Sequence, residues 1–418
     1  MSKHIDIKPV MWLKNKNDLN TREKNSKVNI LTEDFDYIRR FHRQIPNYKN
    51  TPLKSLSRLA DHLGLGGLYV KDEGHRFRLG SFKALGGTFA IFRYIMEKIG
   101  ADCSFEYCDL MRDDVKKIIN KITFATATDG NHGQGVAWAA RKLGCNSVVY
   151  VHKLTSQPRI DTIRENGATV VVVDGNYDDA VRQCNADAKK NGWEIISDTA
   201  WEGYDKVPSW VIQGYSTLFM EIQEQLNAQG VYMPTHVFLQ AGVGSLAVAG
   251  CEFYFKLFGK HRPKLIVVEP DRAPCIFQSA EANLAQGQSI SGDLNTKMAG
   301  LACGDPNPIA WKSLRWMVDA FIQVPDYVAG FGMRILGVPL EGDYEVISGE
   351  SGAVTMGALK FIMQRKDLIE LREFLELGCN SEVLLINTER NTDPTHYREV
   401  VWEGSLSVPK KYRSYRSK

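Results

Sequence analysis

Long hydrophobic runs are missing from this sequence of 418 residues, although 44% of its residues are apolar. No apolar stretch approaches the ~20 residues that a membrane span needs. The first residues also lack the apolar core and the small-residue cleavage site of a signal peptide. We therefore expect a cytoplasmic protein with no membrane partner. The net charge of +3 is spread along the chain, apart from a basic tail at residues 410–418, so no nucleic-acid partner is expected.

Paired cysteines are missing as well. None of the eight cysteines forms a C-x-x-C pair, and Cys103 and Cys108 have no histidine at metal-like spacing. We expect reduced, mostly buried thiols and no metal site. Cys275 and Cys303 lie in loop-like segments and could meet in the fold, which the sequence leaves open.

One short stretch, GSFKALGG at residues 80–87, places Lys83 where a polar loop turns into an apolar helix. A helix N-terminus and an apolar setting both disfavour the ammonium form. We therefore expect Lys83 to be a neutral amine that attacks an aldehyde and holds it as a Schiff base. The alternative is that Ser81 caps the helix and Lys83 is a solvated residue of its first turn.

Strands and helices alternate over much of the chain, which predicts parallel βαβ sheets. Strands are expected at 122–126, 147–151, 169–173, 194–196, 236–240, 265–269 and 383–386. Residues 1–28 are polar and are expected to lie over the surface rather than build the core. The predicted fold class is α/β, with two doubly wound domains of mainly parallel strands that share one cleft. Ligands bind such sheets at the carboxyl ends of the strands.

The turn TATDGNHGQG, residues 126–135, connects a strand to the N-terminus of a helix. Its backbone N–H groups suit a carboxylate or a phosphate, and Asn131 and His132 add side-chain donors. Without a ligand the same residues would make an ordinary Asn-Gly turn. Asp129 in this turn and Asp198 in SDTAW both follow strand ends and face the expected cleft. Either aspartate could instead cap a helix or close an Asx turn.

A second turn, AGVGSLA, follows the strand HVFLQ. Gly242 and Gly244 permit close approach of an anion, and the next helix supplies its positive end, so we expect a phosphate site. A rival interpretation is the relaxed dinucleotide motif Gly242-x-Gly244-x-x-Ala247, with Glu269 holding a ribose hydroxyl. The rival gives no role to Lys83 or to the asparagine turn. A single phosphorylated aldehyde would use all three features.

Together these motifs resemble those of the fold type II pyridoxal-phosphate (PLP) enzymes, which include threonine and serine dehydratases, threonine synthase and the β-subunit of tryptophan synthase. The resemblance extends from Thr51 to Asp393. It implies that Lys83 carries PLP, that Asn131 contacts the phenolic oxygen, and that Thr388 in NTERNTD faces the pyridine nitrogen. The phosphate would lie among the residues of the AGVGSL loop, namely Gly242, Val243, Gly244, Ser245 and Leu246.

Within this group, TDGNHGQGVAWAA, SDTAWEGY and LLINTE are similar to segments of the 2,3-diaminopropionate ammonia-lyases. The similarity implies elimination of D- and L-diaminopropionate to pyruvate and ammonia, with Lys83, Asp129 and Asp198 as catalytic residues. An acidic pair favours this reaction because an amine leaves well only when protonated. Substrate contacts would come from Thr128, Asp129, Gly130, His132 and Asp198. The same family implies a small amino-acid substrate and a homodimer.

We expect a large domain of residues 1–83 and 205–418, a small domain of residues 84–204, and the cofactor between them. Two other functions stay open. A PLP-dependent L-serine or L-threonine dehydratase would turn over serine at least as fast as diaminopropionate. A nicotinamide-dependent oxidoreductase, or a non-catalytic ligand-binding relative, would be colourless.

Overall fold

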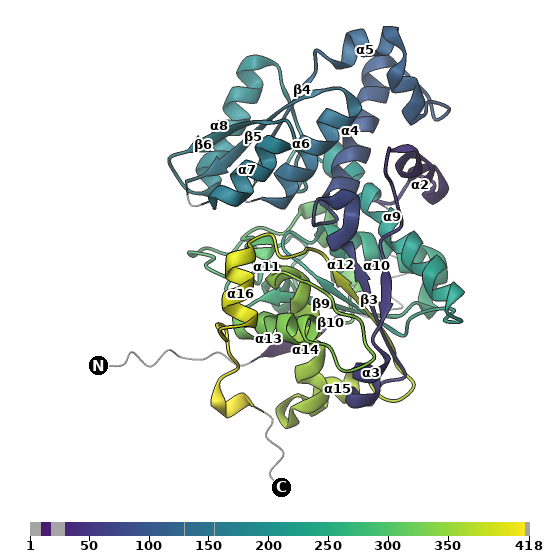
Figure 1. The fold of residues 1–418 in the computed structure, drawn as a ribbon, viewed down its shortest axis with the longest axis vertical. Coiled ribbons are helices and arrows are strands. Elements are labelled where there is room, and N and C mark those ends of the chain that lie inside the picture. Colours follow the sequence, from purple (N-terminus) through teal and green to yellow (C-terminus); the bar gives the residue numbers. More distant parts are fainter. Residues whose placement is uncertain (1–9, 18–29, 129, 154, 414–418) are drawn as a thin grey trace.

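The computed structural model describes residues 10–17, 30–128, 130–153 and 155–413. These residues form two α/β lobes, each built around its own sheet (Figure 1). One sheet has seven strands in the order β1-β10-β9-β8-β11-β3-β2, and the other has four in the order β6-β5-β4-β7. In the described part of the chain, no helix is long and apolar enough to cross a membrane.

The seven-stranded sheet is parallel in its five central strands and antiparallel at both edges. Its strands are β1 (Met11–Lys14), β10 (Ala320–Val324), β9 (Lys264–Pro270), β8 (His236–Gln240), β11 (Glu382–Asn387), β3 (Gly67–Asp72) and β2 (Leu53–Ser55). Most of residues 1–28, expected to lie over the surface rather than build the core, fall outside the described residues; Met11–Lys14 are not buried, but they form an edge strand of the sheet, which was not expected. These residues pair with β10 because an edge strand presents unpaired N–H and C=O groups.

Helices cover both faces of this sheet, as its parallel strands require. Along β8, Val237 and Leu239 belong to one hydrophobic core, whereas Phe238 belongs to the other. The helices of this part of the chain are α2 (Phe35–Gln44), α3 (Ser57–Leu63), α9 (Lys206–Ala228), α10 (Ser245–Phe258), α11 (Cys275–Ala282), α12 (Pro308–Met317), α13 (Asp326–Gly337), α14 (Glu350–Gln364), α15 (Ile369–Leu375) and α16 (Pro394–Val401). Helices α13 and α14 cover the face that includes Phe238, and α9, α10 and α12 cover the opposite face.

The four-stranded sheet is parallel throughout, as predicted. It consists of β4 (Thr123–Ala127), β5 (Asn146–His152), β6 (Thr169–Val173) and β7 (Glu194–Ile195), with α4 (Lys83–Ile99), α5 (Asp113–Ile119), α6 (Asn131–Leu143), α7 (Gln157–Glu165) and α8 (Tyr177–Asn191) around it. Short 3₁₀ helices are η1 (Glu73–Arg78), η2 (Tyr107–Met111), η3 (Gly259–His261), η4 (Ala299–Leu301), η5 (Lys366–Leu368) and η6 (Lys410–Tyr412). The predicted fold class is confirmed, while the domain limits at 83/84 and 204/205 stay a prediction.

Helices α4 and α9 pack together between the two sheets (Figure 1). Their backbones approach so closely at Gly214 that a Cβ there would lie 2.5 Å from the carbonyl oxygen of Leu85. Only glycine fits this contact. The packing fixes the first turn of α4, where Lys83 lies, against an element of the seven-stranded lobe.

Candidate active site

Lys83 is the first residue of α4, and the segment before it runs beside the chain that follows β11. The Phe82 N–H donates to the carbonyl oxygen of Thr388 over 3.3 Å, and Ser81 forms an isolated β-bridge with Glu389. Lys83 Nζ donates a hydrogen bond of 2.5 Å to Oδ2 of Asp198. The side chains are 18% and 17% exposed, so this ion pair is largely buried.

The expectation that Lys83 is a neutral amine is wrong for this structure. Burial by itself lowers the pKa of Lys83, but the Asp198 carboxylate outweighs burial and raises the pKa well above its ordinary value. Burial likewise raises the pKa of Asp198, and the charges of Lys83 and His132 outweigh it and lower the pKa far below the usual range. Both groups are therefore charged at neutral pH.

His132 is a second basic residue close to Oδ2 of Asp198. It is buried in the first turn of α6, and its Nε2 atom lies 3.0 Å from the carbonyl oxygen of Ile196. Its Nδ1 atom is 3.8 Å from Oδ2 of Asp198 and has no hydrogen-bond partner among the described residues. In the same turn, Thr128 Oγ1 accepts from the N–H groups of Gly130 and Gly133. The hydroxyl of Thr128 thereby holds the turn in shape.

Asp129 lies outside the described residues. Its catalytic and substrate-binding roles therefore stay predictions, as do the substrate contacts of Thr128, Gly130, His132 and Asp198.

Asn131 connects the two lobes through Glu389, a residue that the sequence analysis did not select. Asn131 Nδ2 donates to Oε2 of Glu389 over 2.6 Å, and the Ser351 N–H donates to Oε1 over 3.2 Å. Glu389 is 5% exposed, and burial raises the pKa of its carboxyl. In sequence it is one acid in a polar loop, and nothing local indicates that it is buried.

A cavity of about 340 Å³ opens beside Asn131 and is lined by residues of both lobes. The side chains of Arg78, Arg159 and Arg390 contribute to its wall. This cavity makes the mouth of the candidate site basic.

The AGVGSL loop takes the form expected of an anion site. Gly244 has φ of 95°, in the left-handed region, and Ser245 begins α10. The N–H groups of a first helical turn have no partner within the helix, so they point out towards the cleft as donors.

Ser245 Oγ donates to the carbonyl oxygen of Asp198 over 2.6 Å and accepts from Nδ2 of Asn307 over 2.9 Å. The Asn307 N–H donates to the carbonyl oxygen of Val243 over 2.8 Å. The loop is thus tied directly to the Lys83–Asp198 pair.

Two cysteines flank Gly242 in this loop. A Cβ on Gly242 would lie 3.0 Å from Sγ of Cys303, and Cys275 Sγ is 3.6 Å from the Gly242 carbonyl oxygen. The structure forms no disulfide bond among the eight cysteines. The expectation of mostly buried thiols is wrong, since three are buried, Cys184, Cys251 and Cys275. Leu246 is 7% exposed and packs into the core below the loop.

Glu269 does not take the position that a dinucleotide site needs. It is fully buried, and its two carboxyl oxygens accept from the N–H groups of Ile276 and Phe277 in the first turn of α11. Burial raises the pKa of Glu269 to about 8. Because both oxygens face the first turn of α11 in a fully buried position, Glu269 does not present its carboxyl to a ribose, and the nicotinamide interpretation loses its main residue.

Thr388 lies just after β11 and is 4% exposed. Its Oγ1 accepts from Nε2 of Gln240, the last residue of β8, over 3.2 Å. Hydrogen bonds therefore join Lys83 to Asp198 and Asp198 to Ser245, whereas Asn131 bonds Glu389 and Thr388 bonds Gln240. These residues follow the carboxyl ends of strands from both sheets. This is where ligands bind in α/β sheets.

The donor set fits PLP. A lysine suits an aldehyde, and a glycine loop at a helix N-terminus suits a phosphate. Beside the Lys83–Asp198 pair, the buried hydroxyl of Tyr215 has no hydrogen-bond partner among the described residues, although it lies close enough to Lys83 for their charges to interact. Together with Nδ1 of His132, it is a polar atom that a bound ligand can satisfy.

Comparison with known proteins agrees with this geometry. Residues 45–376 match the family model described as pyridoxal-phosphate dependent enzyme. The chain is 46% identical over 375 residues to diaminopropionate ammonia-lyase of Escherichia coli (strain K12), covering 88% of this chain and 92% of the relative. It is 44% identical to diaminopropionate ammonia-lyase of Salmonella typhimurium (strain LT2), covering 87% and 91%.

Solved structures give the same result. Holo diaminopropionate ammonia-lyase from E. coli superimposes with a TM-score of 0.88 at 42% identity, covering 96% of this chain and 99% of that one. A structure of the same enzyme with an aminoacrylate-PLP azomethine reaction intermediate gives a TM-score of 0.86, again at 42% identity and the same coverage. Tomato threonine deaminase isoform 2 shares the fold alone, with a TM-score of 0.68 at 21% identity over 96% of this chain and 98% of that one. The chain therefore belongs to the fold type II PLP-dependent enzymes, in the family of the diaminopropionate ammonia-lyases.

Proposed function

We propose that this chain converts both D- and L-2,3-diaminopropionate, with one water, to pyruvate and two molecules of ammonia. The observation that carries the proposal is the ion pair between Lys83 and Asp198, joined by hydrogen bonds to the AGVGSL loop. The 46% identity to a diaminopropionate ammonia-lyase supports the choice of substrate.

In this proposal Lys83 holds PLP, Asn131 and Thr388 contact its ring substituents, and residues 242–246 hold its phosphate. Bound PLP supplies an electron sink that stabilises negative charge at the α-carbon of an amino acid. Glu389 accepts from Nδ2 of Asn131 and so orients that amide for the ring. The hydroxyl of Thr388 is neutral, so it does not keep a pyridine nitrogen protonated as a carboxylate would.

Asp198 favours a substrate with a positive charge at C3. Its carboxylate stays ionised in a largely buried site, where it pairs with the ammonium of Lys83. The same carboxylate can pair with the β-ammonium of diaminopropionate and keep that leaving group protonated. Serine offers a neutral hydroxyl at this position and gains no such pairing. His132 lies 3.8 Å from the same carboxyl oxygen and favours its negative charge.

Two bases on opposite faces of the substrate would explain use of both isomers. When Asp198 pairs with the β-ammonium of the substrate instead of with Lys83, the lysine can act as a free amine and remove the α-proton from one face, and Asp129 removes it from the other. We also propose a homodimer, which the family resemblance implies, and a cytoplasmic location. The structure forms no disulfide bond among the eight cysteines, which supports a reducing compartment.

The deciding test is pyruvate release by the purified, PLP-loaded protein from D-diaminopropionate, L-diaminopropionate and L-serine. We expect both diaminopropionate isomers to react and serine to react at least about 100-fold more slowly. Asp129→Asn should lose mainly the D-isomer. Equal loss of both isomers would contradict the two-base proposal, and turnover of serine or threonine alone would replace the ammonia-lyase with a dehydratase.

A further inference from the structure

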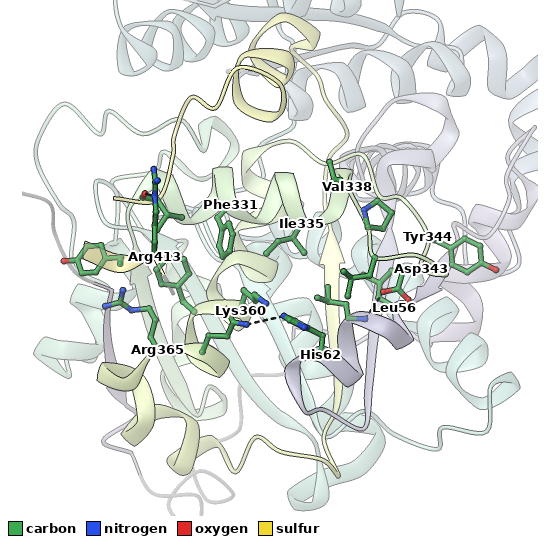
Figure 2. Close-up of a pocket in the computed structure, with 17 residues that line it drawn as sticks. Leu56, His62, Phe331, Ile335, Val338, Asp343, Tyr344, Lys360, Arg365 and Arg413 are labelled. Atoms are coloured by element: carbon green, nitrogen blue, oxygen red, sulfur yellow. Dashed lines mark hydrogen bonds between the residues drawn. The ribbon is translucent and has the colours of Figure 1, made fainter. Parts of the chain in front are cut away.

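A second cavity, of about 840 Å³, lies in the seven-stranded lobe and contains none of the candidate active-site residues (Figure 2). Its walls come from α3, α13, α14 and the chain near residue 410. Leu56, Leu59, Phe331, Ile335 and Phe361 make most of the interior apolar. This volume is within the range of about 300–1,000 Å³ that is typical of small-molecule sites.

The rim of this cavity is also apolar. Val338 is 69% exposed, Leu340 is 44% exposed and Tyr344 is 64% exposed. Exposed apolar side chains that gather around a concave surface mark a place where a ligand or partner is bound. A ligand here would bury the rim as well as the interior.

One charged group in the wall is buried. Lys360, on α14, is 8% exposed, and Figure 2 shows it among the side chains that line the cavity. No ion pair or hydrogen bond connects its ammonium to any described residue. Burial lowers the pKa of Lys360 to about 8, and no nearby acid opposes this effect. A buried cation without a counter-ion is unfavourable unless it has a ligand to pair with.

The other charged groups around the cavity already have partners. Asp343 accepts from the N–H groups of Arg58 and Leu59 at the start of α3. Arg365 pairs with Asp367.

The remaining basic groups are also engaged. Arg413 donates to the carbonyl oxygen of Val408. His62 contacts Gln364 over 3.4 Å, the dashed line in Figure 2. Among the described residues of this wall, Lys360 is thus the buried cation that neither an acid nor a hydrogen bond engages. One cation matches one negative charge, which favours a carboxylate over a phosphate dianion that needs several donors.

We propose that this cavity binds a small monocarboxylate with an apolar body, and that the carboxylate pairs with Lys360 while the body fills the space between α3 and α13. The site is separate from the proposed catalytic cleft, although α14 connects them. Ser351, at the start of α14, donates to Glu389, and Lys360 lies nine residues further on, about 14 Å along the helix.

The test uses 4-phenylbutyrate as the acid probe and 4-phenylbutan-1-ol as its neutral counterpart, each titrated calorimetrically into the full-length, PLP-loaded protein. We expect the acid to bind at least tenfold more tightly than the alcohol. Lys360→Met should weaken acid binding at least tenfold and leave alcohol binding unchanged. Lys366→Met, which removes an exposed lysine near the end of the same helix, should change neither.

Ile335→Trp tests the contribution of the apolar space to binding separately from that of the Lys360 charge. This variant fills the apolar end of the cavity and keeps Lys360, so it should weaken both probes. Retention of the PLP absorbance band shows that each variant is folded. The proposal is overturned if acid and alcohol bind equally well, if neither binds, or if Lys360→Met leaves acid binding unchanged.

Discussion

The charge of Asp198 is the property of a single residue on which the candidate site depends most. The carboxylate lies 2.5 Å from Nζ of Lys83 and 3.8 Å from Nδ1 of His132, in a largely buried position. Removing its charge takes away the main influence that opposes burial, and burial lowers the pKa of the Lys83 amine. The acid therefore sets the protonation state of the lysine as well as the environment of the substrate.

We expect Asp198→Asn to reduce pyruvate formation from diaminopropionate at least about 100-fold, in line with the loss of one acid–base group. PLP should remain bound because Lys83 is unchanged, and its absorbance band checks this. Asp174→Asn is the matched control, since Asp174 is 94% exposed and pairs with an exposed lysine. Activity of Asp198→Asn within tenfold of the wild type would contradict the role assigned to this carboxylate.

At the scale of elements, α16 is attached to the start of α14 by one histidine. His396 Nε2 lies 3.0 Å from Oε1 of Glu350, and its Nδ1 lies 2.9 Å from Oε2 of Glu399. The hydrogen bond to Glu350 is the main reason that the pKa of His396 rises to about 9. Glu350 precedes Ser351, which contacts Glu389, so this pairing holds the end of α14 that faces the candidate site.

The histidine gives a pH-dependent contribution to stability. The pKa of His396 is higher in the folded than in the unfolded chain, so its protonated form stabilises the fold. This stabilisation is complete below about pH 6.5 and is lost as pH rises through about 9. We expect His396→Asn to lower the free energy of unfolding by about 1 kcal/mol at pH 6, since the pair is partly exposed.

At pH 10 this difference between His396→Asn and the wild type should be close to zero. Thermal unfolding of both proteins at the two pH values measures it. His261→Asn, at an exposed position in η3, should show no such pH dependence. A His396→Asn difference that stays constant from pH 6 to pH 10 would argue against the ion pair with Glu350.

At the scale of the whole molecule, a buried cluster of charges fastens α9 to the edge of the seven-stranded sheet. Glu221 on α9 accepts from Lys71 Nζ over 2.6 Å and from Nη1 of Arg76 over 2.7 Å. Arg76 also pairs with Glu73, and all four side chains are fully buried. Since α9 also packs on α4, the cluster connects the sheet to the helix that carries Lys83.

We expect Glu221→Gln to destabilise the chain by about 3–5 kcal/mol, because it leaves two buried cations with one acid between them. Burial alone would raise the pKa of Glu221, but Arg76 and Lys71 outweigh burial and lower it, so the residue is charged at neutral pH. The midpoint of thermal unfolding, with PLP present, measures the effect. Glu370→Gln, at an exposed position on α15, is the control and should leave the midpoint within about 1 °C.

Part of this site could be predicted from sequence because its motifs are local. Residues next to each other in GSFKALGG, TATDGNHGQG and AGVGSLA determine a helix start, a turn and a glycine loop by their own conformational preferences. The resemblance of these segments to known enzymes added Thr388 and the expected contact of Asn131 with the phenolic oxygen of PLP. The alternation of strands and helices also depends on neighbouring residues, and it predicted the parallel sheets.

Tertiary structure decided what depends on residues far apart in the chain. The charge of Lys83 is set by Asp198, 115 positions away, and Asn131 contacts Glu389, 258 positions away. Met11–Lys14 became a strand because β10 left an edge to pair with. The solvation of Lys360 likewise depends on α3 and α13, which no local pattern relates to it. Conformational preference is a property of neighbouring residues, whereas burial, charge pairing and pKa arise only when the folded chain brings distant residues together.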